Sequence, residues 1–143
     1  MSEEVLIEIK SKQVVGDQEE NTDVIARGVH SIENGLHHLE YDEFDSETDD
    51  KTSSKIVFDE GLAKVQRTGA FNGSLIFEKG KKRESMYSTP FGEINWDIIT
   101  HDIQIEEQEK ELNLKIVYEL YAQNEKVSDH TISVNIKNLN DNA

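Results

Sequence analysis

The chain has 143 residues, no cysteine and a formal net charge of −15 at pH 7. This length favours one domain with a substantial core, and the lack of cysteine excludes a disulfide framework, a cysteine-ligated metal site and a thiol nucleophile. The negative charge argues against binding to DNA or RNA, whose phosphates are held by lysine and arginine. No stretch approaches the ~20 apolar residues of a membrane-spanning helix, and the N-terminus lacks the basic start and apolar run of a signal peptide. We therefore expect a soluble, cytoplasmic protein that binds neither nucleic acid nor membranes.

Alternating apolar and polar residues predict β-strands from the N-terminus onward, and the first begins near Val5. A second strand is predicted over 20–30, where Gly28 indicates a bulge or a close backbone approach. Asn34-Gly35 predicts a type I′ hairpin turn, because both positions of that turn need a positive φ. The returning strand is predicted over 36–44.

The middle of the chain reads as short strands separated by tight turns. Glu60-Gly61 and Asn72-Gly73 each predict a turn, and the basic segment 79–83 predicts a third. Strands are predicted over 51–59, 62–69, 74–78 and 84–87.

A long strand is predicted from Gly92 to Ile105, followed by two more over 111–120 and 127–137. The apolar positions of the long strand change parity, which predicts a bulge near Ile98–Thr100. Residues 138–143 are expected to form a frayed tail. No window shows a convincing helical period, so we predict an all-β fold in a single domain over residues 1–143.

The short connections favour an antiparallel up-and-down β-barrel over a Greek-key sandwich. Strands that follow one another with one apolar face each must close or stack to cover that face and their edges. The interior of such a barrel is filled by side chains or holds one small ligand.

Five short segments appear in a characteristic order: Leu39–Glu43, Arg67–Ala70, Tyr87–Glu93, Thr100 and Ile116–Tyr118. In this order and spacing the chain resembles the YwiB-like family of bacterial proteins of unknown function, from about Val5 to Ile136. The resemblance implies a calycin-like (lipocalin-type) barrel of about 8–10 strands in a bacterial cytosol. It implies no activity. The acidic loop 45–50 and the pair His37-His38 depart from the family pattern without affecting the fold.

Polar side chains on predicted inward faces are the main pointers to function. Arg67 shares its face with apolar neighbours, and His37, Tyr41 and Glu43 share the face of Leu39. A buried arginine requires a partner, and Glu43, two strands away, is the nearest counter-charge. Arg67 therefore either closes one end of the barrel structurally or receives the acidic head of a ligand.

The segment 87–92 also allows two interpretations. Pro90 fixes its own φ and extends the residue before it, which favours a strand corner. The alternative is a rim loop in which the hydroxyls of Tyr87 and Thr89 face the cavity. The candidate ligand-binding side chains of the barrel interior or mouth are His37, Tyr41, Glu43, Arg67, Tyr87, Thr89, Tyr118 and His130.

No metal ion or cofactor is expected. The acidic segment 40–50 suggests calcium, but Asp50 stands where an EF-hand loop needs glycine and Ile56 where it needs glutamate, so we interpret the segment as a solvated loop. The neighbours His37 and His38 point to opposite faces of one strand and cannot chelate together.

Three functions remain open. The first is a non-catalytic binding module that holds a small, partly apolar molecule in the barrel. If Arg67 binds this molecule, the molecule carries an acidic group. The second is a protein-interaction or structural domain with a packed barrel and an acidic surface, which a packed interior would support. The third is an enzyme that uses Glu43 with His37 or a tyrosine as acid and base.

Overall fold

The computed structural model describes residues 2–44, 50–69, 72–89 and 92–139, and of residues 87–89 it describes the backbone. Ten strands make up the described chain. They are β1 (Ser2–Val15), β2 (Gln18–Glu33), β3 (Leu36–Phe44), β4 (Lys51–Phe58), β5 (Leu62–Gly69), β6 (Asn72–Glu78), β7 (Lys82–Thr89), β8 (Gly92–Gln108), β9 (Glu111–Ala122) and β10 (Glu125–Asn138).

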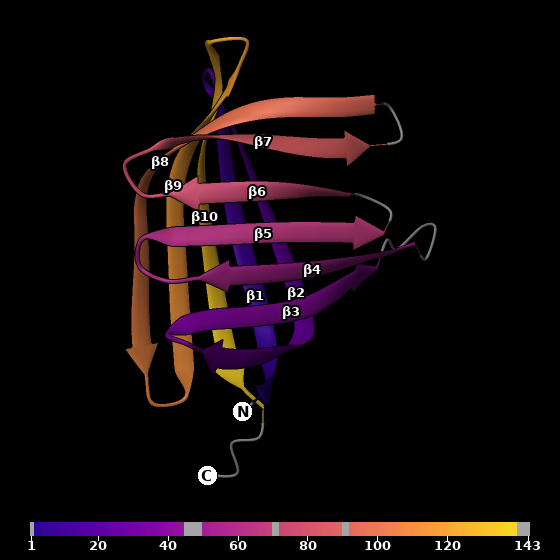
Figure 1. Cartoon of the computed structure of the whole chain (residues 1–143), viewed down its shortest axis with the longest axis vertical. Helices are drawn as coiled ribbons and strands as arrows, with labels where there is room; N and C mark the ends of the chain where they lie inside the picture. The colour runs from indigo at the N-terminus through magenta and orange to yellow at the C-terminus, as the bar shows by residue number, and fades with distance from the viewer. Residues whose placement is uncertain (1, 45–49, 70–71, 90–91, 140–143) are drawn as a thin grey trace.

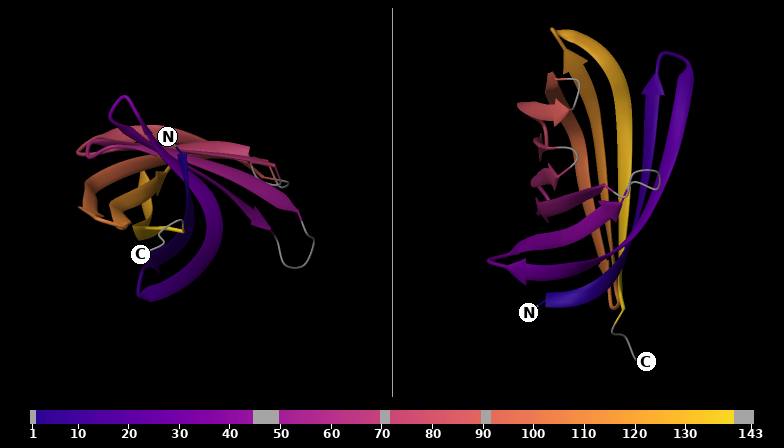
Figure 2. Two further views of the ribbon diagram at one scale, coloured as in Figure 1. Left: turned by 90° about the horizontal axis from the view of Figure 1, so that it is seen from below. Right: turned by 90° about the vertical axis from the view of Figure 1, so that its right-hand side faces the viewer.

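The strands form a closed antiparallel barrel in which each strand pairs with the next in sequence and β1 pairs with β10. This confirms the predicted all-β, up-and-down barrel, at the upper end of the predicted strand number. The barrel is flattened into two layers: β3 to β7 cross in front of the long strands β9, β10, β1 and β2 (Figure 1), and the side view shows the same two layers edge-on (Figure 2). None of the described residues belongs to a helix that could cross a membrane.

The long strand β8 belongs to both layers. Its first half pairs with β7, from Gly92 to Ile99, and its second half pairs with β9, from Asp97 onward. The register with β9 shifts between Thr100 and Asp102, which is a bulge one or two residues beyond the predicted position. The bulge moves the inward face from even to odd residues, so that Ile98 and Ile103 both lie in the core.

The turns follow the local chemistry, with one exception. Asn34 and Gly35 both have a positive φ, as the predicted type I′ turn requires. The β4–β5 turn is held by Asp59, whose Oδ1 accepts hydrogen bonds from the backbone of Gly61 and Leu62. The hairpin predicted at Asn72-Gly73 is present between β5 and β6, but the predicted position of its turn is wrong, because both residues belong to β6. Gly73 pairs there with Arg67 and with Tyr87, so cross-strand pairing has overridden the local turn preference.

The centre of the barrel is packed with apolar side chains. Of the described residues, sixteen apolar ones from eight strands are at most 7% exposed. An enclosed space large enough for a ligand would leave accessible surface on the side chains around it. The very low exposure of these sixteen side chains therefore indicates a filled centre. Gly28 allows β2 to approach β3 closely, since a Cβ there would lie 2.3 Å from the Glu40 carbonyl oxygen.

The expected frayed tail begins later than residue 138. Asn138 is the last residue of β10 and its backbone N–H donates to the Lys110 carbonyl at 3.2 Å. The N–H of Leu139 donates to the Glu4 carbonyl at 3.0 Å. These two bonds tie the end of β10 to the barrel, and residues 140–143 lie outside the described chain.

Candidate functional site

An ion pair between β3 and β5 marks one end of the barrel. The Arg67 Nη2 lies 3.1 Å from the Glu43 Oε1 and donates a hydrogen bond to it. The two side chains point inward from strands separated by β4, and they remain 31% and 26% exposed. The partner expected for Arg67 from the sequence is therefore present, at a place where solvent reaches both charges.

Two buried tyrosines lie within electrostatic reach of Arg67. Burial raises the pKa of the Tyr41 phenol, and the Glu43 carboxylate raises it further while Arg67 opposes the rise. Burial also raises the pKa of the Tyr118 phenol, again against the influence of Arg67. Both phenols are therefore neutral hydrogen-bond donors at physiological pH, facing a guanidinium that stays charged.

His130 completes this end on the opposite layer. Its ring stacks on Tyr118 with the centroids 4.8 Å apart, and Tyr118 also contacts the ring of Phe77 at 4.7 Å. The His130 Nε2 lies 2.6 Å from the Ser128 hydroxyl. Burial lowers the pKa of His130, with Asp129 opposing the change, so the ring is neutral at pH 7. The structure thus brings Tyr41, Glu43, Arg67, Tyr118 and His130 to the interior faces of the barrel, as the sequence predicted.

For two of the candidate residues the structure describes the strand alone. Tyr87 and Thr89 belong to β7, but their side chains lie outside the described structure, as do Pro90 and the acidic residues 45–49. The corner and rim-loop interpretations of 87–92 and the calcium interpretation of 40–50 therefore stay predictions. Within the described residues, no three acidic or histidine side chains converge to hold a metal ion.

His37 lies at the opposite end of the barrel from Arg67. It stands on the same strand as Glu43 but six positions away, about 20 Å at ~3.3 Å per residue. The proposed acid–base pair of Glu43 and His37 is therefore wrong, because no side-chain movement spans that distance. His37 instead has its Nδ1 3.0 Å from His30 Nε2 and its Nε2 3.2 Å from Glu107 Oε1, and its ring stacks on Phe58.

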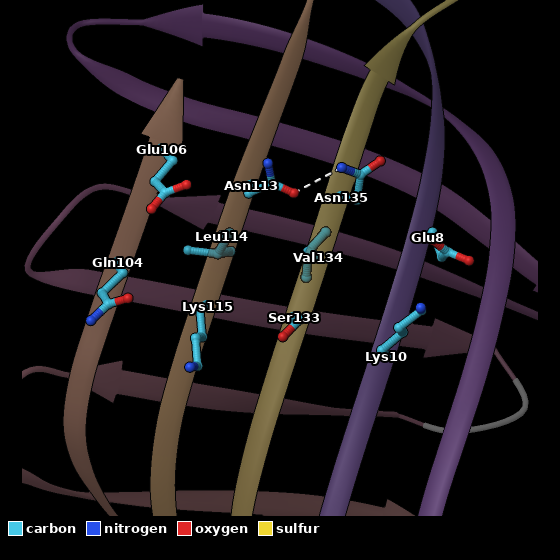
Figure 3. Close-up of a pocket in the computed structure, with 10 residues that line it drawn as sticks. All are labelled: Glu8, Lys10, Gln104, Glu106, Asn113, Leu114, Lys115, Ser133, Val134 and Asn135. Atoms are coloured by element: carbon cyan, nitrogen blue, oxygen red, sulfur yellow. Dashed lines mark hydrogen bonds between the residues drawn. The ribbon is translucent and has the colours of Figure 1, made fainter. Parts of the chain in front are cut away.

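The outer surface carries a groove that sequence reasoning missed. It has a volume of about 450 Å³ and runs over the outward faces of β8, β9, β10 and β1 (Figure 3). Asn135 Nδ2 donates to Asn113 Oδ1 at 2.8 Å across it, and it also donates to the Glu111 carboxylate. Two lysines and two glutamates line the groove, so its charges balance. In the sequence these residues are indistinguishable from an ordinary solvated strand face.

Comparisons with known proteins identify the family and the fold. The sequence profile described as "Domain of unknown function (DUF1934)" matches residues 7–134. The crystal structure of the ywiB protein from Bacillus subtilis is similar, with a TM-score of 0.84 at 20% sequence identity, over 96% of this chain and 92% of that one. No functionally curated protein matches the sequence significantly.

Proposed function

Because the chain belongs to the DUF1934 family, a domain of unknown function, we propose its role from the barrel itself: it binds a small, partly apolar anion at the barrel end marked by Arg67 and Glu43. The observation that carries this proposal is the Arg67–Glu43 pair, whose side chains face the barrel interior but remain 31% and 26% exposed. An ion pair placed there for stability alone would contribute little, since exposed pairs are worth about 0–1 kcal/mol.

The chemistry around Arg67 suits a carboxylate or a similar anion. A guanidinium presents several N–H donors in one plane and binds an oxyanion through two of them. The neutral phenols of Tyr41 and Tyr118 add hydroxyl donors. Val65 and Leu75, which pair across β5 and β6 and are only partly buried, offer apolar surface for the rest of a ligand. In the absence of a ligand, Glu43 accepts a hydrogen bond from the Arg67 guanidinium and holds it in place. The incoming anion competes with the Glu43 carboxylate for this donor.

The packed centre limits how deep the ligand reaches. Leu39, Phe58 and Phe77 are fully buried and fill the space between the layers. The ligand therefore rests at the barrel end and does not run through the barrel. This favours a short molecule over a long-chain lipid.

Native mass spectrometry of protein purified without denaturation tests the proposal. We expect a small molecule to be retained by the wild-type protein and by the Arg27→Ala variant, whose arginine is exposed on the outer face of β2. Arg67→Ala loses this mass while remaining folded, as judged by its melting temperature. A mass retained equally by Arg67→Ala would show that the ligand binds elsewhere.

A second function, a protein-interaction domain, is favoured by the packed centre together with the net charge of −15. An acidic surface attracts basic proteins, and the attraction weakens as salt screens it. Pull-down of a defined basic protein that disappears between low and physiological salt would support this function, and salt-independent association would count against it.

A further inference from the structure

One strand edge of the front layer is left unpaired. The first residues of β8, Glu93 to Trp96, pair with β7 on one side, whereas the ladder to β9 begins only at Asp97. Among the described residues, no strand pairs with the other side of Glu93–Trp96. This part of β8 forms the upper border of the front layer in Figure 1. An exposed edge presents free backbone N–H and C=O groups to any extended chain.

A groove of about 920 Å³ lies along this edge. Its lining includes the exposed apolar side chains Met86 and Ile94, at 51% and 39% exposure, and the only tryptophan of the chain, Trp96. Its acidic side chains are Glu84, Glu93 and Asp97, and no lysine or arginine lines it.

The groove has unneutralised negative charge. Asp97 pairs with Lys82 at 3.6 Å. Among the described residues, neither Glu84 nor Glu93 has a lysine or arginine within ion-pair distance. A cationic occupant would therefore meet two carboxylates that have no competing partner.

We propose that an extended peptide with basic side chains at alternate positions adds to the β8 edge as an extra strand. Side chains of a strand alternate between its faces. On β8 the acidic Glu93 and Asp97 point outward, whereas Ile94 and Trp96 share the inward parity of the fully buried Ile98. An added strand that alternates basic and apolar residues therefore places its charges against the carboxylates and its apolar side chains against Ile94 and Trp96.

A second copy of this chain does not fit the same edge. Antiparallel pairing of two β8 edges would bring the carboxylates of both copies together, and each copy carries a net charge of −15. The charge complementarity thus selects a basic partner and disfavours self-association through this edge.

The test uses the nonapeptide in which lysine alternates with valine, titrated at low salt into the full-length protein. Trp96 is the only tryptophan and lines this groove, so the tryptophan fluorescence comes from a side chain at the proposed binding edge. We expect a saturable change in fluorescence as peptide is added. The double variant Glu84→Gln/Glu93→Gln should weaken the peptide affinity about fivefold, because it removes two ion pairs worth ~0.5 kcal/mol each.

The matched control removes the same charge at another unpaired edge. Among the described residues, β2 pairs with β3 only from Gly28 onward, and the exposed Glu20 and Asp23 lie on its earlier part. Glu20→Gln/Asp23→Asn is expected to leave the affinity unchanged. Equal weakening by both double variants would show attraction to the overall charge and overturn the proposal.

Two N-methylated peptides test the strand geometry. Alternate backbone N–H groups of an added strand point toward the edge it joins. Methylation of one alternate set is expected to abolish binding, and methylation of the other set is expected to preserve it. Equal binding of both peptides, or equal binding of a glutamate–valine peptide, would overturn strand addition.

The groove is separate from the proposed ligand site. Arg67 lies three strands from Ile94, about 14 Å at ~4.8 Å per strand. Arg67→Ala is therefore expected to leave peptide binding unchanged, so that failure of either proposal does not decide the other.

Discussion

Arg67 on β5 reaches past β4 to Glu43 on β3, with Nη2 and Oε1 3.1 Å apart, so that one ion pair joins two strands that are not neighbours at the end of the barrel. Both side chains face inward but keep contact with solvent. This combination makes the pair measurable in two ways, through its contribution to stability and through its competition with an added anion.

The first prediction concerns the stability of this pair. Arg67→Met and Glu43→Gln should each lower the free energy of unfolding by about 1–2 kcal/mol, because each leaves a partly desolvated charge or dipole without its partner. The loss of unfolding free energy in the double variant should be smaller than the sum of the two single losses by about 0.5–1 kcal/mol. Urea unfolding followed by Trp96 fluorescence measures all three, and strictly additive losses would show that the two side chains do not interact in solution.

The second prediction uses a buried hydroxyl that lacks a partner. Thr100 is fully buried, and its Oγ1 has no hydrogen-bond partner among the described residues. Thr100→Val should therefore be neutral or stabilise the protein by up to about 1 kcal/mol, since it removes an unsatisfied polar group at nearly constant volume. Ser128→Ala is the matched control and should destabilise by about 1 kcal/mol, because the Ser128 hydroxyl lies 2.6 Å from His130 Nε2. A clear loss of stability for Thr100→Val would indicate a hydrogen bond that the structure lacks.

The third prediction concerns the contact between β2 and β3. A Cβ at Gly28 would lie 2.3 Å from the Glu40 carbonyl oxygen and 2.6 Å from the Ile7 Cδ1. Gly28→Ala should therefore destabilise the barrel by roughly 2–3 kcal/mol, because backbone must move to relieve the overlap. Gly61→Ala is the control, since the nearest atom to its Cβ would be the Asp59 Oδ1 at 3.7 Å. Thermal unfolding measures both, and a Gly28→Ala variant as stable as Gly61→Ala would contradict the close approach.

The fourth prediction concerns acid stability. The pKa of His30 is lowered by burial and by the nearby His37, against the influence of Glu3 and Glu107, and the pKa of His130 is lowered by burial. Groups whose pKa is lower in the folded state bind fewer protons there than in the unfolded chain. Stability is therefore complete above the ordinary histidine pKa of about 6.5 and falls as the pH drops below it.

Urea unfolding at pH 7.5 and pH 5.5 tests this window, which lies above the range where the carboxyl groups titrate. The wild-type protein should lose more stability between these values than a His30→Asn/His130→Asn variant. His38→Asn is the control, since His38 lies on the outward face of β3. An equal loss in the wild type and the double variant would assign the acid sensitivity to other groups.

Much of the fold followed from local pattern. Alternation of apolar residues fixed which faces of β3, β5, β9 and β10 point inward, and the positive φ required by Asn34-Gly35 fixed that turn. The inward parity of Arg67 and Glu43 was visible for the same reason. The apolar residues of β8 change from even to odd positions, and this change predicted the bulge because a strand keeps one parity on each face.

The errors arose where non-local pairing decides the outcome. Asn72-Gly73 has the composition of a turn, yet pairing with β5 and β7 extends β6 through it. The free edge at Glu93–Trp96 exists because β9 ends near Tyr121, which no local pattern reveals. The pairing of Glu43 with His37 as acid and base is already excluded by the spacing along the strand, which separates the two residues by about 20 Å.

The central claim is that Arg67 selects an anion at the barrel end. Isothermal titration calorimetry with octanoate and with octanol tests it directly, because the two probes share the apolar chain and differ in charge. We expect the wild-type protein and Arg27→Ala to bind octanoate more tightly than octanol, and Arg67→Ala to lose that preference. An undiminished preference for octanoate in Arg67→Ala, or no binding of octanoate to the wild-type protein, would contradict it.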